Sequence, residues 1–99
     1  MIRIVKPGRI PCCVPFCGRT AKDEGVEDQE IICAKHWRLA DRRLTRRFKR
    51  FRRAVDTAIE LPLETYCSRA RARIVRRLKL CQTLWEQIKT QAIERAVGI

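Results

Sequence analysis

The sequence has a single histidine, few aromatic residues and no long apolar segment. No stretch approaches the roughly 18–20 apolar residues that a membrane-spanning helix requires. Basic residues and Pro7 interrupt residues 1–14, so this segment contains no apolar run of the length found in signal peptides. These absences predict a small protein of a reducing cytoplasm rather than a membrane or secreted protein.

Six cysteines are many for a chain of 99 residues. A chain of this length forms one small domain with a limited core, and such domains often need a metal ion or disulfides. In a secreted protein the cysteines would suggest a disulfide scaffold. In the cytoplasm, cysteines serve as metal ligands or as small buried apolar residues. Because residues 1–14 do not resemble a signal peptide, we favour the second interpretation.

Two pairs of potential metal ligands are separated by fifteen residues. Cys13 and Cys17 flank a turn, and Cys33 and His36 follow as a Cys-x-x-His pair at the start of a predicted helix. Residues three apart on a helix share a face, and zinc prefers four thiolate or imidazole ligands in a tetrahedron. The spacing therefore predicts a treble-clef-like structural Zn²⁺ site made by these four residues. Cys12 is an alternative to Cys13 as the first ligand, and it would give the spacing Cys-x4-Cys in place of Cys-x3-Cys.

The ligand count disfavours a catalytic zinc site. Catalytic sites keep three protein ligands and a water molecule beside a general base. Here four ligands fill the coordination shell, and the chain has no second histidine. The acidic loop at residues 23–30 offers carboxylates, but a solvated loop explains them more simply. We therefore predict no enzymatic activity and keep a zinc-dependent nuclease only as a third hypothesis.

Two long helices are predicted after the first ligand pair. Apolar residues recur every three or four positions over residues 34–60, without glycine or proline, and again over residues 63–96. Pro62 separates the two segments, because the residue before a proline avoids the helical conformation. Gly98 follows the second segment as a stop signal. Short strands are predicted only near residues 2–5 and 30–32.

Neither predicted helix can bury its apolar stripe alone, so we predict that the two helices pair as an antiparallel helical hairpin. The expected fold class is mainly α, with an N-terminal arm and zinc knuckle at residues 1–36 and a long basic hairpin at residues 37–99. Cys67 and Cys81 fall on the stripe of the second helix and are interpreted as core residues. The excess length of that helix would pack on the zinc knuckle or on another subunit, and a homodimer through the hairpin is compatible with this arrangement.

Basic residues form two blocks within the predicted helices. Residues 38–53 hold nine Lys and Arg against one acid, and residues 69–79 hold six against none. A solvated helix face normally mixes the two signs, whereas like charges at helical spacing repel. The net charge of +12 therefore predicts an anionic partner, and arginine favours phosphate because it binds phosphate oxygens through two N–H groups. The predicted nucleic-acid-binding residues are Arg42, Arg43, Arg46, Arg47, Arg50, Arg53, Arg69, Arg73 and Arg76.

Residues 33–38, with the sequence CAKHWR, follow a Cys-x3-Cys turn and precede an arginine-rich helix. This layout resembles short uncharacterised proteins encoded by bacteriophages and prophages, which share a Cys…Cys…Cys-x-x-His-Trp pattern followed by two helices. The resemblance covers most of the chain, rests mainly on residues 13–38, and implies zinc binding and a bacterial host cytoplasm. Many of those proteins place a proline a few residues after the His-Trp pair. Here residues 39–41, LAD, contain none, so we expect the helix to continue unbroken.

Two functional hypotheses follow. The first is a small zinc-stabilised protein that binds nucleic acid, DNA rather than RNA, mainly through phosphate contacts, with salt-sensitive affinity and limited sequence preference. The second is a phage-encoded interaction protein that binds an acidic host protein and modulates transcription or defence.

Overall fold

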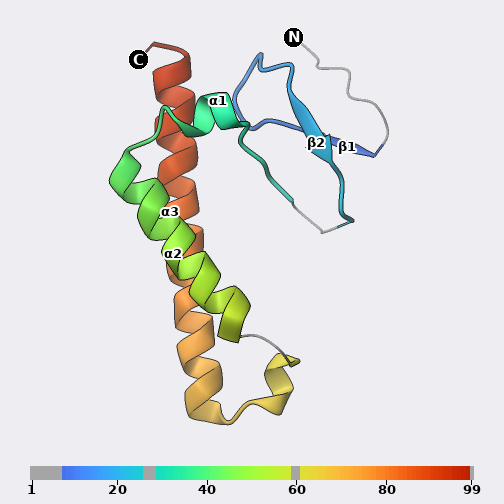
Figure 1. Ribbon diagram of the computed structural model, residues 1–99, viewed down its shortest axis with the longest axis vertical. Coiled ribbons are helices and arrows are strands. Elements are labelled where there is room, and N and C mark those ends of the chain that lie inside the picture. The colour runs from blue at the N-terminus through green and yellow to red at the C-terminus, as the bar shows by residue number, and fades with distance from the viewer. Residues whose placement is uncertain (1–7, 26–28, 59–60, 99) are drawn as a thin grey trace. The chain divides into compact units, whose positions relative to one another are not determined.

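The computed structural model describes residues 8–25, 29–58 and 61–98 (Figure 1). This part of the chain is mainly helical, as predicted, with one small sheet of two strands. None of its helices is long and apolar enough to cross a membrane. The elements in chain order are β1 (Arg9–Pro11), β2 (Thr20–Lys22), α1 (Ala34–Trp37), α2 (Arg42–Ala58), a 3-10 turn (Leu63–Thr65) and α3 (Ser68–Ala96).

The chain folds as two compact units. The first comprises residues 1–40 together with residues 89–99, and the second comprises residues 41–88. Helix α3 contributes to both units, and its C-terminal end groups with the cysteine-rich segment. The predicted division after residue 36 lies close to the observed one after Ala40, but it leaves out this contribution of α3.

The two strands enclose the cysteine-rich turn. They pair antiparallel, with Arg9 opposite Lys22 and Pro11 opposite Thr20. The side chain of Arg9 donates from Nε to Thr20 Oγ1 and from Nη2 to the Thr20 carbonyl, both at 3.1 Å. This hairpin was not predicted, because three-residue strands show too little alternation to be recognised. The strand predicted at residues 30–32 is reduced to a single parallel bridge between Ile31 and Cys12. The strand predicted at residues 2–5 lies outside the described residues.

The first predicted helix is interrupted. Residues 38–41 separate α1 from α2, so the prediction of one unbroken helix over residues 34–60 is wrong. The backbone N–H of Arg43 donates to Asp41 Oδ1 at 2.8 Å, and the N–H of Thr45 donates to the Asp41 carbonyl at 3.1 Å. These two bonds make Asp41 the N-cap of α2. An N-cap residue has a non-helical backbone, so a helix coming from α1 has to end before Asp41.

The second predicted helix begins five residues late, because a 3-10 turn precedes α3. The Tyr66 hydroxyl donates to the Ala58 carbonyl at 2.8 Å and accepts from the Leu61 N–H at 3.2 Å. These bonds hold the linker in a turn against the end of α2. Cys67 therefore lies outside α3 and is exposed, so its predicted place in a buried stripe is wrong.

The other end of α3 follows the prediction. The helix ends at Ala96, and Gly98 adopts a φ of 79°, a left-handed conformation that glycine reaches without steric cost. Between Ser68 and Ala96 there is neither glycine nor proline. The helix therefore runs without interruption for 29 residues.

The second unit has its own apolar core. The Phe48 and Trp85 rings contact each other with centroids 5.7 Å apart and planes tilted by 43°, which joins α2 to α3. The buried apolar residues of the unit are Val55, Ile74, Cys81, Leu84 and Ile88. Cys81 is buried, as predicted, and burial is the main cause that raises the pKa of its thiol.

We expect Asp41→Ala to destabilise α2, because the substitution removes the acceptor of the Arg43 N–H. The loss should be about 1 kcal/mol of unfolding free energy, the usual value of an N-cap. Asp41→Asn is the matched control, since the amide oxygen can still accept this bond. Urea unfolding followed by circular dichroism measures both variants, and equal stabilities of Asp41→Ala and Asp41→Asn would contradict the capping role.

Candidate metal centre and basic surface

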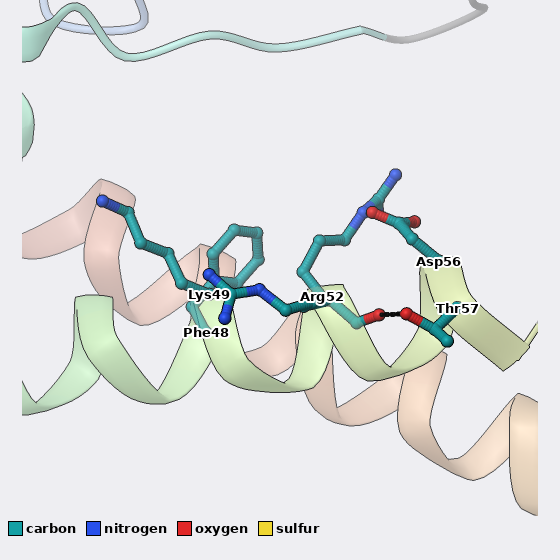
Figure 2. A pocket seen from close by; sticks show the side chains of 6 residues that line it. Phe48, Lys49, Arg52, Asp56 and Thr57 are labelled. Carbon is teal, nitrogen blue, oxygen red and sulfur yellow. Dashed lines mark hydrogen bonds and ion pairs between the residues drawn. The ribbon is translucent and has the colours of Figure 1, made fainter.

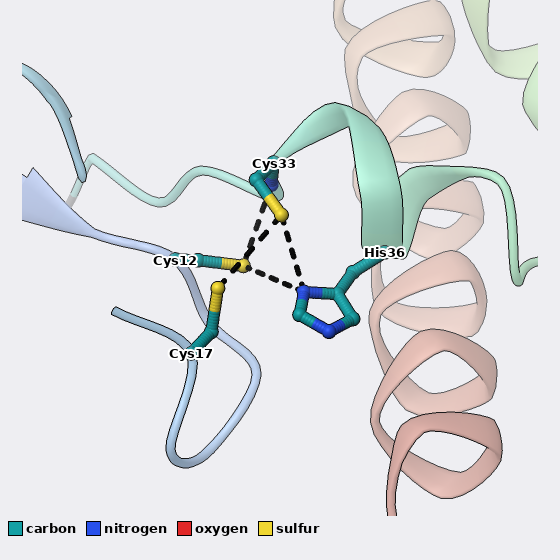
Figure 3. A group of neighbouring side chains, drawn as sticks. All are labelled: Cys12, Cys17, Cys33 and His36. Atoms are coloured by element: carbon teal, nitrogen blue, oxygen red, sulfur yellow. Dashed lines mark hydrogen bonds between the residues drawn. The ribbon is translucent and has the colours of Figure 1, made fainter. Parts of the chain in front are cut away.

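Four side chains in the first unit point toward one common centre (Figure 3). They are Cys12 and Cys17 from the turn between β1 and β2, and Cys33 and His36 from the start of α1. Their sulfur atoms and one histidine nitrogen all lie within 4.8 Å of one another. None of the six cysteines forms a disulfide. The group therefore has the composition and closeness of a metal site with three sulfur ligands and one nitrogen ligand.

Two of three distances within the group are close to those expected between the ligands of a tetrahedral metal ion. Metal–sulfur bonds of about 2.3 Å and metal–nitrogen bonds of about 2.05 Å would separate two sulfurs by about 3.8 Å and a sulfur from a nitrogen by about 3.6 Å. The Sγ atoms of Cys17 and Cys33 are 3.8 Å apart, and Cys12 Sγ lies 3.8 Å from His36 Nδ1. Cys33 Sγ and His36 Nδ1 are closer, at 3.1 Å, and would have to separate by about 0.5 Å to admit the ion.

Backbone hydrogen bonds fix the turn that carries the first ligand pair. The Cys12 N–H donates to the Arg19 carbonyl at 3.0 Å, which continues the ladder of the β hairpin. The Cys17 N–H donates to the Val14 carbonyl at 3.2 Å and closes a four-residue turn. Pro15 takes the second position of this turn, where proline is favoured. Both sulfurs are thus presented from one short, bonded loop.

The second ligand pair is fixed by the start of α1. Cys33 is the N-cap of this helix, with φ −67° and ψ 160°, and its carbonyl accepts from the Trp37 N–H at 2.9 Å. The Cys33 N–H donates to Cys12 Sγ at 3.3 Å. A backbone N–H directed at a sulfur stabilises the thiolate form that a metal requires. The two ligand pairs are therefore joined by a hydrogen bond as well as by the common centre.

The cysteine pKa values follow from burial and from these bonds. Burial is the main cause that raises the pKa of the Cys17 thiol. Burial also acts to raise the pKa of Cys33, but hydrogen bonds from the backbone of His36 and from the neighbouring thiols outweigh it and lower that pKa overall. The Cys33 thiol therefore ionises more readily than that of an ordinary cysteine.

Cys13 does not join the cluster. Its thiol donates to Glu30 Oε2 at 3.6 Å, while its N–H donates to the Ile31 carbonyl at 2.8 Å. Burial, and next the negative charge of Glu30, raise the pKa of Cys13 to about 11. The preference for Cys13 over Cys12 is corrected accordingly: the structure brings together Cys12, Cys17, Cys33 and His36. Successive residues of an extended segment point to opposite sides, so only one of the two adjacent cysteines can face the centre.

The C-terminal end of α3 covers the metal centre within the first unit. Ala92 is fully buried and belongs to the same small core as Cys12, Val14 and Cys17, with Ile93 packed against it. Lys89 forms an ion pair with Glu30 at 2.9 Å, and the Arg95 guanidinium donates to the Leu39 carbonyl. The sequence predicted that the excess length of the second helix would pack either on the zinc knuckle or on another subunit. Within the first unit, this part of α3 packs on the knuckle.

The nine arginines predicted to bind nucleic acid all belong to the second unit, and all are exposed. Six lie on α2 and three on the first half of α3. Within residues 8–25, 29–58 and 61–98, no carboxylate forms an ion pair with any of the nine. In the described part of the second unit, an ion pair joins two residues that do not belong to these nine arginines. Arg52 Nε lies 3.3 Å from Asp56 Oδ1. Both residues are well exposed, so this pair adds little stability.

Two of the arginines are held by an aromatic ring. The guanidinium carbons of Arg47 and Arg50 each lie 5.8 Å from the centroid of the Phe51 ring. Such cation–π contacts contribute about 0.5–1 kcal/mol each at exposed positions. Phe51 lies within the segment whose apolar periodicity predicted a helix, and its contact with the two cations is a role that this periodicity did not reveal.

An open hollow of about 420 Å³ lies along α2 (Figure 2). Cations and an aromatic ring line most of it, and Asp56 is the acid at its rim. The lining residues are Phe48, Lys49, Arg52, Arg53, Asp56 and Thr57. The arrangement could accept an anionic group against the cations. Of these residues, the sequence had indicated only Arg53 as a nucleic-acid contact.

Comparison of the chain with protein families, with curated proteins and with solved structures finds no match.

The substitutions Cys12→Ser and Cys13→Ser should show which of the two adjacent cysteines is a metal ligand. We expect Cys12→Ser to weaken metal binding more than about 100-fold, because it removes a ligand and not merely an outer contact. Cys13→Ser should retain the metal, since its thiol faces Glu30. Titration with Co²⁺ followed by thiolate-to-cobalt absorption measures both affinities. Metal loss in Cys13→Ser alone would show that the ligand set contains Cys13.

Proposed function

We propose that the protein is a small, zinc-stabilised, non-enzymatic nucleic-acid-binding protein. The first unit uses zinc as a structural ion, and the second unit contacts phosphates through its arginines. The single observation that supports this most strongly is the set of nine exposed arginines on α2 and α3 without a carboxylate partner among the described residues. An anionic polymer would neutralise the repulsion between them.

The choice of zinc follows from the donor set. Three thiolates and one imidazole form one of the ligand sets common in structural zinc sites, and soft sulfur ligands disfavour magnesium or calcium. Four protein ligands leave no open position for substrate. The two-stranded hairpin that carries one ligand pair, followed by a helix that carries the other, supports a treble-clef-like knuckle.

The helical hairpin remains part of this proposal. The ring contact between Phe48 and Trp85 supports α2 and α3 pairing within the second unit. With Phe48 beside Trp85, an antiparallel pair would place Arg69, Arg73 and Arg76 beyond the arginines of α2 along the hairpin, so that the two basic blocks would contact successive phosphates of one backbone. Single phosphate contacts carry no sequence information, so the expected binding is strong, salt-dependent and weakly selective.

The partner proposed is DNA rather than RNA, in the cytoplasm of a bacterial host. The phage or prophage setting rests on the likeness of residues 13–38 to small phage-encoded proteins. The alternative is an acidic host protein as the anionic partner, with an effect on transcription or defence. Capture of one host protein that survives nuclease treatment would favour that alternative.

Removal of the metal should unfold the first unit and spare most of the second. Binding of structural zinc contributes about 10–16 kcal/mol to the folding of small zinc-dependent domains, and the core around Cys12 and Cys17 is too small to replace it. We therefore expect a strong chelator to abolish amide protection over residues 12–36, while α2 keeps its helical signal. Hydrogen exchange with elemental analysis measures this. Protection that persists in metal-free protein would contradict a structural role.

Neutralising exposed arginines should reduce the salt dependence of binding. The logarithm of affinity falls against the logarithm of salt concentration with a slope of about −0.9 for each phosphate contact on duplex DNA. We expect Arg46→Gln/Arg53→Gln to make this slope about 1.8 less steep and to weaken binding to random-sequence duplexes. Fluorescence anisotropy across a salt series measures both quantities.

Lys35→Gln/Arg38→Gln is the matched control for the arginine pair, because it removes the same charge from exposed positions of the first unit. Its slope should stay close to that of the unchanged protein. Equal effects of the two double variants would mean that net charge alone governs binding and that α2 is not the phosphate-contacting element.

A further inference from the structure

The turn of the metal centre carries a phenylalanine in an unusual conformation. Phe16 is 72% exposed, and it is the one residue other than glycine with a positive φ, 67°, within residues 8–25, 29–58 and 61–98. In this left-handed region the side chain of an L-residue clashes with its own backbone, so glycine or asparagine normally occupies the third position of such a turn. The protein therefore holds a large apolar side chain in solvent at a place where glycine would fit without strain.

The turn has little freedom to relieve this strain. Pro15 precedes Phe16, and the Cys17 N–H closes the turn on the Val14 carbonyl at 3.2 Å. Cys12 and Cys17, the cluster members on each side of the turn, are both buried. Strain of this kind persists where the surrounding structure over-determines it, and it is found most often at binding sites. Packing does not explain Phe16, because most of its surface is open to solvent.

The chemistry around Phe16 points to one class of ligand. Residues 12–22 contain no acid, and they contain Arg19 and Lys22, whose side chains are exposed. An exposed aromatic ring on a short segment that carries two exposed cations and no acid fits a flat π-system on an anionic backbone, which is a nucleobase in a single strand. Bases within a duplex are already stacked on their neighbours and present only their edges in the grooves. We propose that Phe16 stacks on an unpaired base, so that the knuckle is a single-strand contact separate from the arginines of α2 and α3.

This inference rests on the proposed function and makes it more specific, because it gives the two units different targets on one nucleic acid. The arginines contact phosphates of either a duplex or a single strand, whereas Phe16 requires a free base. The protein would then prefer a junction, loop or unwound end over a continuous duplex.

The test compares three fluorescently labelled probes: a short single-stranded oligothymidylate, an abasic strand of the same length, and a random-sequence duplex. We expect Phe16→Gly to weaken binding of the oligothymidylate roughly 5- to 150-fold, the range for loss of one base–aromatic stack, and to leave the abasic strand and the duplex unchanged. Phe16→Tyr should bind the oligothymidylate as the unchanged protein does, because its ring still stacks.

Two controls separate stacking from folding and from general apolar contact. Phe16→Gly should keep its metal, since glycine suits the positive φ, and native mass spectrometry checks this. Leu61→Ala removes another exposed apolar side chain, which lies in the second unit, and should change no affinity.

The outcomes distinguish this inference from the proposal on which it rests. If the unchanged protein binds none of the three probes, both the proposed function and the stacking role of Phe16 are contradicted. If it binds all three but Phe16→Gly keeps full affinity for the oligothymidylate, or loses the same factor on the abasic strand, only the stacking role falls. Loss of a nuclease-resistant protein partner in Phe16→Gly, with unchanged oligothymidylate affinity, would place Phe16 in a protein interface and overturn the inference.

Discussion

The first unit depends on four ligand atoms held around one point. Its buried core consists of little more than Cys12, Val14, Cys17 and Ala92, so two of the four core side chains are themselves cluster members. A core of this size cannot offset the conformational entropy of ordering a loop-rich segment. Three thiolates this close together would also repel one another unless a cation neutralised their negative charge. A bound cation removes both difficulties at once, which is why the local fold and the proposed ion have to be considered together.

The second unit obeys a different constraint, because its helices carry like charges at helical spacing. Helix α2 has eight Lys and Arg against a single acid, and that acid, Asp56, already pairs with Arg52. Repulsion of this kind weakens an isolated helix. What opposes it here is the Asp41 cap, the ring contact of Phe48 with Trp85, and the Phe51 ring beneath two guanidinium groups. The unit thus stays helical while leaving its positive charge exposed to solvent. This is the property that a phosphate-binding surface needs.

Those parts of the fold that depend on local spacing could be predicted, and those that depend on side-chain direction could not. Cys33 and His36 are three apart on a helical turn, so their meeting follows from the sequence. The choice between Cys12 and Cys13 depends on which of them the hairpin ladder turns inward, and the hydrogen bond from Cys12 N–H to Arg19 decides this. The break before α2 did have a sequence signal: Asp41 directly precedes the arginine run, and an Asp at that place is a common N-cap. The apolar periodicity of residues 34–60 continues across Asp41, so the periodicity alone predicted one uninterrupted helix.

Strain at Phe16 and metal binding are connected through the same turn. A free four-residue turn with phenylalanine at its third position would relax to another conformation, since a left-handed backbone costs an L-residue roughly 1–2 kcal/mol. With Cys12 and Cys17 both bound to one ion, relaxation would have to pull a ligand away from it, and that costs far more than the strain. A bound metal would therefore allow this turn to keep a side chain that its backbone disfavours. An ordinary apolar core of this size could not do so, because its packing energy per residue is of the same order as the strain itself. The exposed ring at position 16 would thus be a consequence of building this unit around an ion.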